Sequence, residues 1–158
     1  MLHKIPNGIL EIIEVFGNPN SSNFETNNII TFDLPYTLFY DKKPVNQARA
    51  HKLAVDNFIK GFKNVEDAGL AKQFVEFNGI YAKRNIRGRD RISLHSFGIA
   101  IDMEAFDITV GDVTAHQLGS TKRFPDKIVE CFTSVGFFYG GDFKGRKDPM
   151  HFQLATGY

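Results

Sequence analysis

The sequence has little cysteine and no tryptophan, and neither positive nor negative charges predominate. Its 158 residues include one cysteine, Cys131, and no Trp. A single thiol cannot form an intramolecular disulfide, so no covalent cross-link holds the fold together. Lys and Arg number 19 against 18 Asp and Glu, whereas domains steered onto nucleic acid or anionic lipid carry a strong net charge. We therefore predict neither nucleic acid nor a membrane surface as a partner.

Long apolar runs and linkers are also missing. No window reaches the roughly 18 consecutive apolar residues typical of a membrane helix. The run from Ile9 to Phe16 is interrupted by Glu11 and Glu14, and no cleavage pattern follows it. We therefore expect neither membrane insertion nor a secretory signal. No repeat or Pro/Gly/Ser-rich segment divides the chain, so residues 1–158 are expected to form a single domain.

Phenylalanine, in contrast, is abundant. The chain has 16 Phe and 5 Tyr, and 42% of its residues are hydrophobic. A chain of this length buries roughly 68–70% of the surface that its unfolded form exposes. We therefore expect a well-formed core filled largely by benzyl side chains.

Periodicity and chain-breaking residues predict both helices and strands. The expected helices span 9–16, 44–62 and 125–135, with a loop over 18–28. The expected extended segments span 29–32, 36–39, 74–84, 98–103 and 151–154. Pro35 should keep at least one of its flanking segments away from a sheet centre. Cys131 falls on the apolar face of the last helix and is interpreted as a buried hydrophobe. Helices that precede clustered strands favour an α+β fold.

One chemically distinctive stretch follows Gly98. The alternation there places Asp102 on the same strand face as Gly98 and Ala100, while the intervening apolar residues face the core. Two such small neighbours leave space beside the carboxylate for an ion and a ligand. His95 lies an odd number of residues earlier, so it reaches that face only if the chain turns or bulges, which costs least at Gly98.

A second stretch lies near the end of the sequence. His151 and Gln153 alternate with apolar residues, which places an imidazole on the polar face of a strand. Asp148 lies three residues before His151, close enough in sequence for its carboxylate to reach the same site. Alone, a histidine more often lies on the surface or in a core, and Asp102 alone also fits a turn. Together, two imidazoles and one carboxylate are the ligand set of a catalytic zinc ion with an open position for water.

These residues resemble a known family. Ser93 and His95, followed by Asp102, and then Asp148 and His151, are similar to the motif of the zinc D-alanyl-D-alanine carboxypeptidases and L-alanyl-D-glutamate endopeptidases, which include bacteriophage endolysins. Further similar segments are Gly17-Asn18-Pro19, Arg84 and residues 138–143. The resemblance spans most of the chain and implies a small α+β domain whose central antiparallel sheet carries the zinc, with helices packed on its other side.

The resemblance also implies a role for each matching residue. His95, Asp102 and His151 would hold Zn²⁺, and Asp148 would be the catalytic carboxylate that moves a proton during peptide hydrolysis. Arg84 would assist the substrate and the developing oxyanion, although the basic run over residues 83–91 also fits a solvated loop.

Two further residues are candidates for substrate binding. Ser93 would hydrogen-bond substrate or a neighbouring loop. Asp142 would line the cleft, although a turn carboxylate has the same pattern. Glu104 is expected to be exposed. The remaining histidines, His3, His51 and His116, have no partners at metal spacing and are interpreted as surface residues.

The sequence thus predicts a zinc metallopeptidase that acts as a monomer on the stem peptide of peptidoglycan, as in cell wall degradation. The Asp-Pro-Met-His segment resembles the L-alanyl-D-glutamate endopeptidase branch. D-alanyl-D-alanine carboxypeptidase activity is the first alternative. A zinc-binding recognition domain without turnover, as in the related hedgehog signalling domain, is the second. The missing export signal is compatible with phage-type release from the host cytoplasm or with delivery on a virion.

Overall fold

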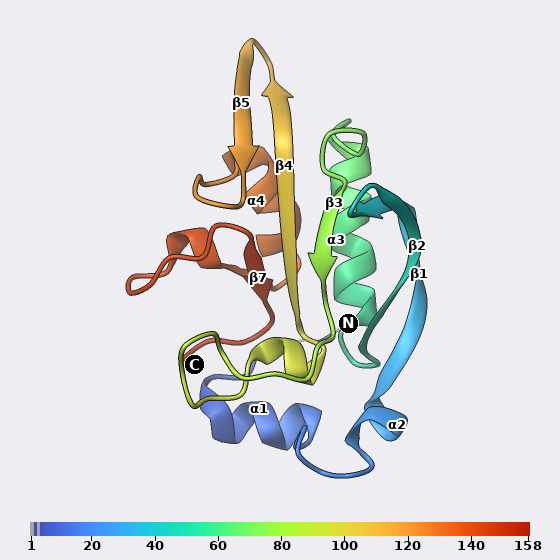
Figure 1. The fold of residues 1–158 in the computed structure, drawn as a ribbon, viewed down its shortest axis with the longest axis vertical. Coiled ribbons are helices and arrows are strands. Elements are labelled where there is room, and N and C mark those ends of the chain that lie inside the picture. The colour runs from blue at the N-terminus through green and yellow to red at the C-terminus, as the bar shows by residue number, and fades with distance from the viewer. Residues whose placement is uncertain (1, 3) are drawn as a thin grey trace.

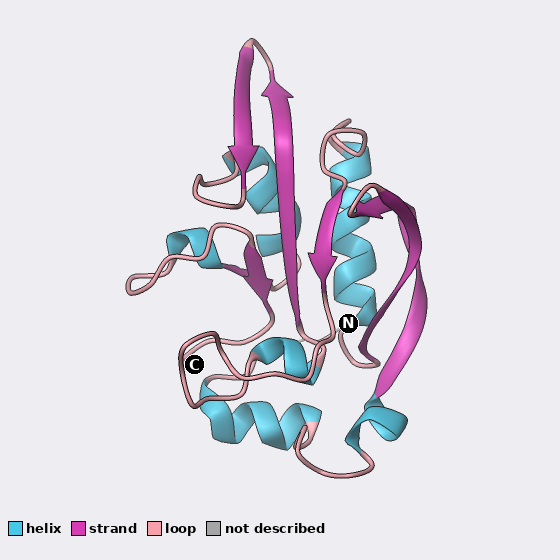
Figure 2. Ribbon diagram, viewed as in Figure 1, coloured by secondary structure: helices cyan, strands magenta, loops and turns pink. Residues whose placement is uncertain are grey.

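Helices and strands are interspersed along the chain (Figure 2). The computed structural model describes residue 2 and residues 4–158. Its helices are α1 (Gly8–Phe16), α2 (Phe24–Asn28), α3 (Val55–Asp67) and α4 (Asp126–Thr133), with 3₁₀ turns η1 (Leu94–Phe97) and η2 (Gly140–Asp142). Its strands are β1 (Ile29–Tyr40), β2 (Lys43–His51), β3 (Glu76–Gly79), β4 (Ala100–Val110), β5 (Val113–Leu118), β6 (Phe138–Tyr139) and β7 (His151–Gln153).

Within the described residues, all of these strands join one seven-stranded sheet. The order is β2-β1-β3-β4-β7-β6, and β5 pairs with β4 to form the long hairpin seen in Figure 1. Neighbouring strands run antiparallel except β1 and β3, which are parallel. The predicted α+β class is confirmed, with a central sheet that is mostly antiparallel. No helix in the described part of the chain is long and apolar enough to span a membrane.

Several expected elements are present. The first and last predicted helices correspond to α1 and α4, and both segments around Pro35 belong to β1. β1 lies between β2 and β3 but pairs with β3 only at Phe39, so the segment 29–32 has a strand partner on one side, as the proline suggested. The pairing with β2 is interrupted between Asp33 and Leu38, so the missing proline N–H falls where the ladder is broken.

The predicted helix over 44–62 is wrong in its first part. Residues Lys43–His51 form β2, and the helix begins only at Val55. Ala48 and Ala50 are buried at alternate positions, so this segment follows the period of a strand. Its backbone hydrogen bonds are made with β1 across a tight turn in which Asp41 and Lys42 have positive φ angles. This hairpin pairing outweighs the helical pattern of the segment.

Other differences concern shorter elements. The expected loop over 18–28 contains α2, which buries Phe24. Only residues 76–79 of the expected extended segment 74–84 form a strand, and β4 continues far beyond the predicted residue 103. Strands occur from residue 29 onward, so the expected order of helices before strands is wrong. Glu104 is half-buried on β4 rather than exposed.

Phenylalanine fills the core as predicted. Helices α3 and α4 cover one face of the sheet (Figure 1), and their contact is centred on Phe132. The Phe132 ring lies 5.3 Å from that of Phe62 and 5.0 Å from that of Phe152 on β7. Cys131 is buried as expected, and burial raises the pKa of its thiol. The helices therefore bury one sheet face and leave the other for the polar side chains of β4 and β7.

Candidate metal centre

Strands β4 and β7 bring a carboxylate and an imidazole together. Asp102 and His151 are cross-strand partners in register, so their side chains leave the sheet on the same face. Their neighbours Ile101 and Phe152 also pair and are fully buried on the opposite face. His151 Nδ1 lies 2.9 Å from Asp102 Oδ1. The apolar alternation of the two strands thus fixes which face carries the polar pair.

A turn delivers the second imidazole from η1. Gly98 ends η1 in the left-handed conformation with φ 71°, which redirects the chain into β4. His95 thereby reaches the Asp102 face, with Nε2 at 3.2 Å from Asp102 Oδ2. The sequence pointed to a change of direction at Gly98, and the structure has one there.

Gly98→Ala tests how tightly this turn is built. An added Cβ would lie 2.6 Å from the His51 backbone nitrogen and 2.8 Å from Ile29 Cδ1. We expect the free energy of unfolding to fall by about 2–5 kcal/mol, because left-handed φ costs a residue with a Cβ about 1–2 kcal/mol and overpacking adds about 1–3 kcal/mol. Thermal unfolding measures the change. Gly145→Ala is the matched control, because it has open space and no positive φ; equal stability of the two variants would contradict the prediction.

The hydrogen-bond partners of His95 fix which ring nitrogen is free. His95 Nδ1 lies 2.7 Å from the carbonyl oxygen of Ile80, which can only accept, so Nδ1 carries the proton. Nε2 then holds a lone pair. It is buried and has no hydrogen-bond partner, although Asp102 Oδ2 is close. A lone pair and a carboxylate oxygen that face each other at 3.2 Å are stabilised by a cation between them.

His95, Asp102 and His151 together could hold a metal ion. One ligand atom from each residue lies within 4.8 Å of the others. Burial raises the pKa of the Asp102 carboxyl, but the hydrogen bond with His151 and the nearby His95 outweigh burial and hold that pKa well below its usual range. For the His151 imidazole, burial lowers the pKa, but the hydrogen bond with Asp102 and the negative charge of Asp102 raise that pKa above its ordinary value. Two nitrogen atoms and a carboxylate oxygen are a donor set that suits zinc.

Asp148 lies beside this group without belonging to it. Its Oδ2 is 4.0 Å from His151 Nδ1, and its side chain is half-exposed. Burial raises the pKa of its carboxyl above the ordinary value. The backbone N–H of Asp148 donates to the Gly140 carbonyl at 2.9 Å, and the Tyr139 hydroxyl donates to the Pro149 carbonyl at 2.6 Å. These contacts fix the loop that carries the carboxylate.

Arg84 reaches the group from the basic loop. Its Nη2 is 3.9 Å from Asp102 Oδ2, and its side chain is about half-exposed. The Ser96 hydroxyl holds the loop, because it accepts from the Arg84 N–H and donates toward the Arg84 carbonyl, both at 2.8 Å. Ser93 is buried and does not face open space. Its Oγ accepts from the His95 N–H at 3.2 Å, so it caps η1.

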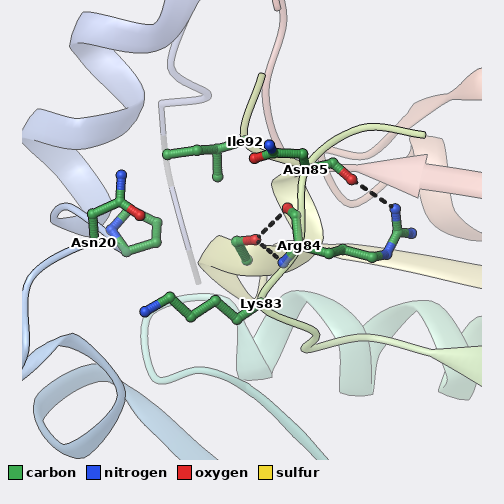
Figure 3. Close-up of a pocket in the computed structure, with 7 residues that line it drawn as sticks. Asn20, Lys83, Arg84, Asn85 and Ile92 are labelled. Carbon is green, nitrogen blue, oxygen red and sulfur yellow. Dashed lines mark hydrogen bonds between the residues drawn. The ribbon is translucent and has the colours of Figure 1, made fainter. Parts of the chain in front are cut away.

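A pocket of about 280 Å³ lies on the other side of Arg84. Asn20, Lys83 and Ile92 surround it, while the Arg84 side chain extends away toward the Asn85 carbonyl (Figure 3). Arg84 contributes to the pocket lining and its guanidinium approaches Asp102, but His95, Asp102 and His151 do not line the pocket.

The remaining candidates have other contacts. Asp142 forms a two-point ion pair with Arg123, at 2.8 Å and 3.1 Å, and that guanidinium lowers the pKa of its carboxyl. Its expected role in substrate binding stays a prediction. His116 is exposed, as expected, and pairs with Asp107. His51, expected at the surface, is buried instead, with Nε2 at 2.8 Å from the Phe16 carbonyl. His3 lies outside the described residues.

The sequence reasoning missed two residues at this site. Ser96 anchors the Arg84 loop, and no sequence signal distinguishes it from a surface serine. Gln153 is buried against His151, with Oε1 at 2.9 Å from His151 Nε2. A signal for Gln153 did exist, because residues two apart on a strand share a face.

Comparison with known proteins adds an independent observation. No curated protein matches the chain. Residues 87–154 match a family model described as D-alanyl-D-alanine carboxypeptidase. This segment contains His95, Asp102, Asp148 and His151, whereas Arg84 lies just outside it. The part of the chain that carries the metal-binding group is therefore similar to the D-alanyl-D-alanine carboxypeptidase family.

Proposed function

We propose that this protein is a zinc-dependent peptidase that hydrolyses a peptide bond in the stem peptide of peptidoglycan. The observation that carries the proposal is the convergence of His95 Nε2, His151 Nδ1 and the Asp102 carboxylate, with Asp148 beside them. A structural zinc site would be closed by four protein ligands. This group has three, within the described residues, and a half-exposed carboxylate next to them.

Each residue of the site has a separate role in peptide hydrolysis. A bound zinc ion supplies Lewis acidity, which lowers the pKa of water and polarises a carbonyl group. Asp148 accepts the proton of the attacking water and returns it to the leaving nitrogen. The Arg84 guanidinium stabilises the negative charge that develops on the carbonyl oxygen. The Ile80 carbonyl and the Gln153 amide hold the two imidazoles, and the Asp102 carboxylate would be the third metal ligand.

Two substrate specificities compete within this proposal. The Asp-Pro-Met-His segment resembles the L-alanyl-D-glutamate endopeptidases, and we propose this bond as the one cleaved. The family description favours instead the terminal D-alanyl-D-alanine bond. The positive charges of Lys83 at the pocket and of the Arg84 guanidinium near Asp102 suit a substrate that carries carboxylates.

Digestion of purified peptidoglycan separates these possibilities. With one equivalent of Zn²⁺, we expect new amino termini on D-glutamate, identified by labelling and mass spectrometry, and no products after treatment with a chelator. Release of free D-alanine alone would assign the protein as a carboxypeptidase. A zinc-loaded protein that cleaves neither bond would overturn the proposal and favour a recognition domain.

A further inference from the structure

Gln153 occupies a fixed orientation beside His151. It is buried on β7, two residues after His151 and on the same face. Its Nε2 lies 2.9 Å from the Ala155 carbonyl oxygen, which can only accept a hydrogen bond. The amide nitrogen must therefore face Ala155, and the amide oxygen must face His151.

This orientation determines the proton position on His151. Gln153 Oε1 lies 2.9 Å from His151 Nε2 and has no proton to donate, so Nε2 must carry the hydrogen. The other neutral tautomer would set the Nε2 lone pair against the amide oxygen in a buried site. Rotation of the amide does not help, because its oxygen would then face the Ala155 carbonyl. In the neutral ring, which is the form that binds a metal, Nδ1 is left with the lone pair, and it donates to Asp102 only when the ring is protonated.

We propose that Gln153 is a positioning residue that selects the His151 tautomer and so makes Nδ1 the metal-binding atom. It does for His151 what the Ile80 carbonyl does for His95, but at the opposite ring nitrogen. Ala100 pairs with Gln153 across the strands, and its small side chain leaves room for the amide. The inference rests on the proposed function only in that it requires a metal ion at this group.

Zinc affinity of the purified chain tests this role without any activity measurement. Gln153→Leu removes the acceptor and should weaken zinc binding by about 10–100-fold, as is usual when a residue that orients a metal ligand is lost. Competition with a chelating dye gives the affinity, and near-ultraviolet circular dichroism checks the fold. Gln153→Glu keeps an acceptor and should bind zinc more tightly than Gln153→Leu. Gln47→Leu, on the exposed face of β2, is the matched control.

Nuclear magnetic resonance gives a second readout on the unaltered protein. In zinc-loaded wild type, long-range ¹H–¹⁵N correlations should show the His151 proton on Nε2 and the His95 proton on Nδ1. A His151 proton on Nδ1 would overturn the inference even if the Leu variant fails to fold. Unchanged zinc affinity in folded Gln153→Leu would do the same. If wild type binds no zinc, the proposed function itself fails, which distinguishes the two results.

Discussion

Asp148→Asn should lower the rate of stem-peptide hydrolysis by about 10²–10⁴-fold while zinc stays bound, the usual range for loss of a general acid–base group. The amide keeps the size of the carboxylate but cannot accept a proton from water. Asp148 lies outside the group of three side chains that could hold the metal, so the number of zinc ions bound per protein should not change. Steady-state hydrolysis and metal analysis of the same preparation measure both effects.

The pH profile of wild type provides a further check on Asp148. Burial raises the pKa of this carboxyl, and the proton acceptor must be ionised. Activity should therefore rise with pH through a value above the ordinary aspartate pKa. Asp112→Asn, on the exposed β4–β5 turn, should retain full activity. Hydrolysis at the wild-type rate by Asp148→Asn would remove this residue from the mechanism.

The same pKa shift has a consequence for stability. The folded-state pKa of Asp148 lies above its unfolded value, so the protonated carboxyl stabilises the fold at low pH. That contribution is lost as the pH rises through the folded pKa. At neutral pH the Asn variant should therefore be no less stable than wild type, and thermal unfolding of both proteins measures this.

His95→Ala should abolish both stoichiometric zinc binding and hydrolysis. The change removes a metal ligand itself. Loss of a residue that only supports a ligand lowers metal affinity by about 10–100-fold, so zinc affinity should fall by more than that here. Metal analysis after dialysis and the hydrolysis assay measure the two losses, and circular dichroism checks the fold. His116→Ala removes an exposed imidazole paired with Asp107 and serves as the control. Full zinc content in folded His95→Ala would exclude this residue as a ligand.

The sequence predicted the convergence at the site better than it predicted the sheet. Strand alternation placed Asp102 and His151 on polar faces, and Gly98 marked the turn that brings His95 to them. Both signals are local. The sequence did not reveal β2, because the apolar residues of this segment also fit a helical period, and pairing with the adjacent β1 outweighs that pattern.

Hydrogen bonding explains what was missed around the site. The burial of His51 and the role of Ser96 depend on the carbonyl groups of Phe16 and Arg84, which folding brings into reach from other segments. Gln153 was recognisable as a neighbour of His151, but its function depends on the direction of one amide. That direction is set by a single carbonyl group at Ala155.

The register of β7 against β4 links metal occupancy to folding. His151 is separated by 49 residues from Asp102, so the unfolded chain has no preformed chelate. An ion that binds only the native state adds to its stability by mass action, by about 2.7 kcal/mol when free metal exceeds the dissociation constant 100-fold. The protein's resistance to heat and proteases should therefore follow the zinc supply of its surroundings.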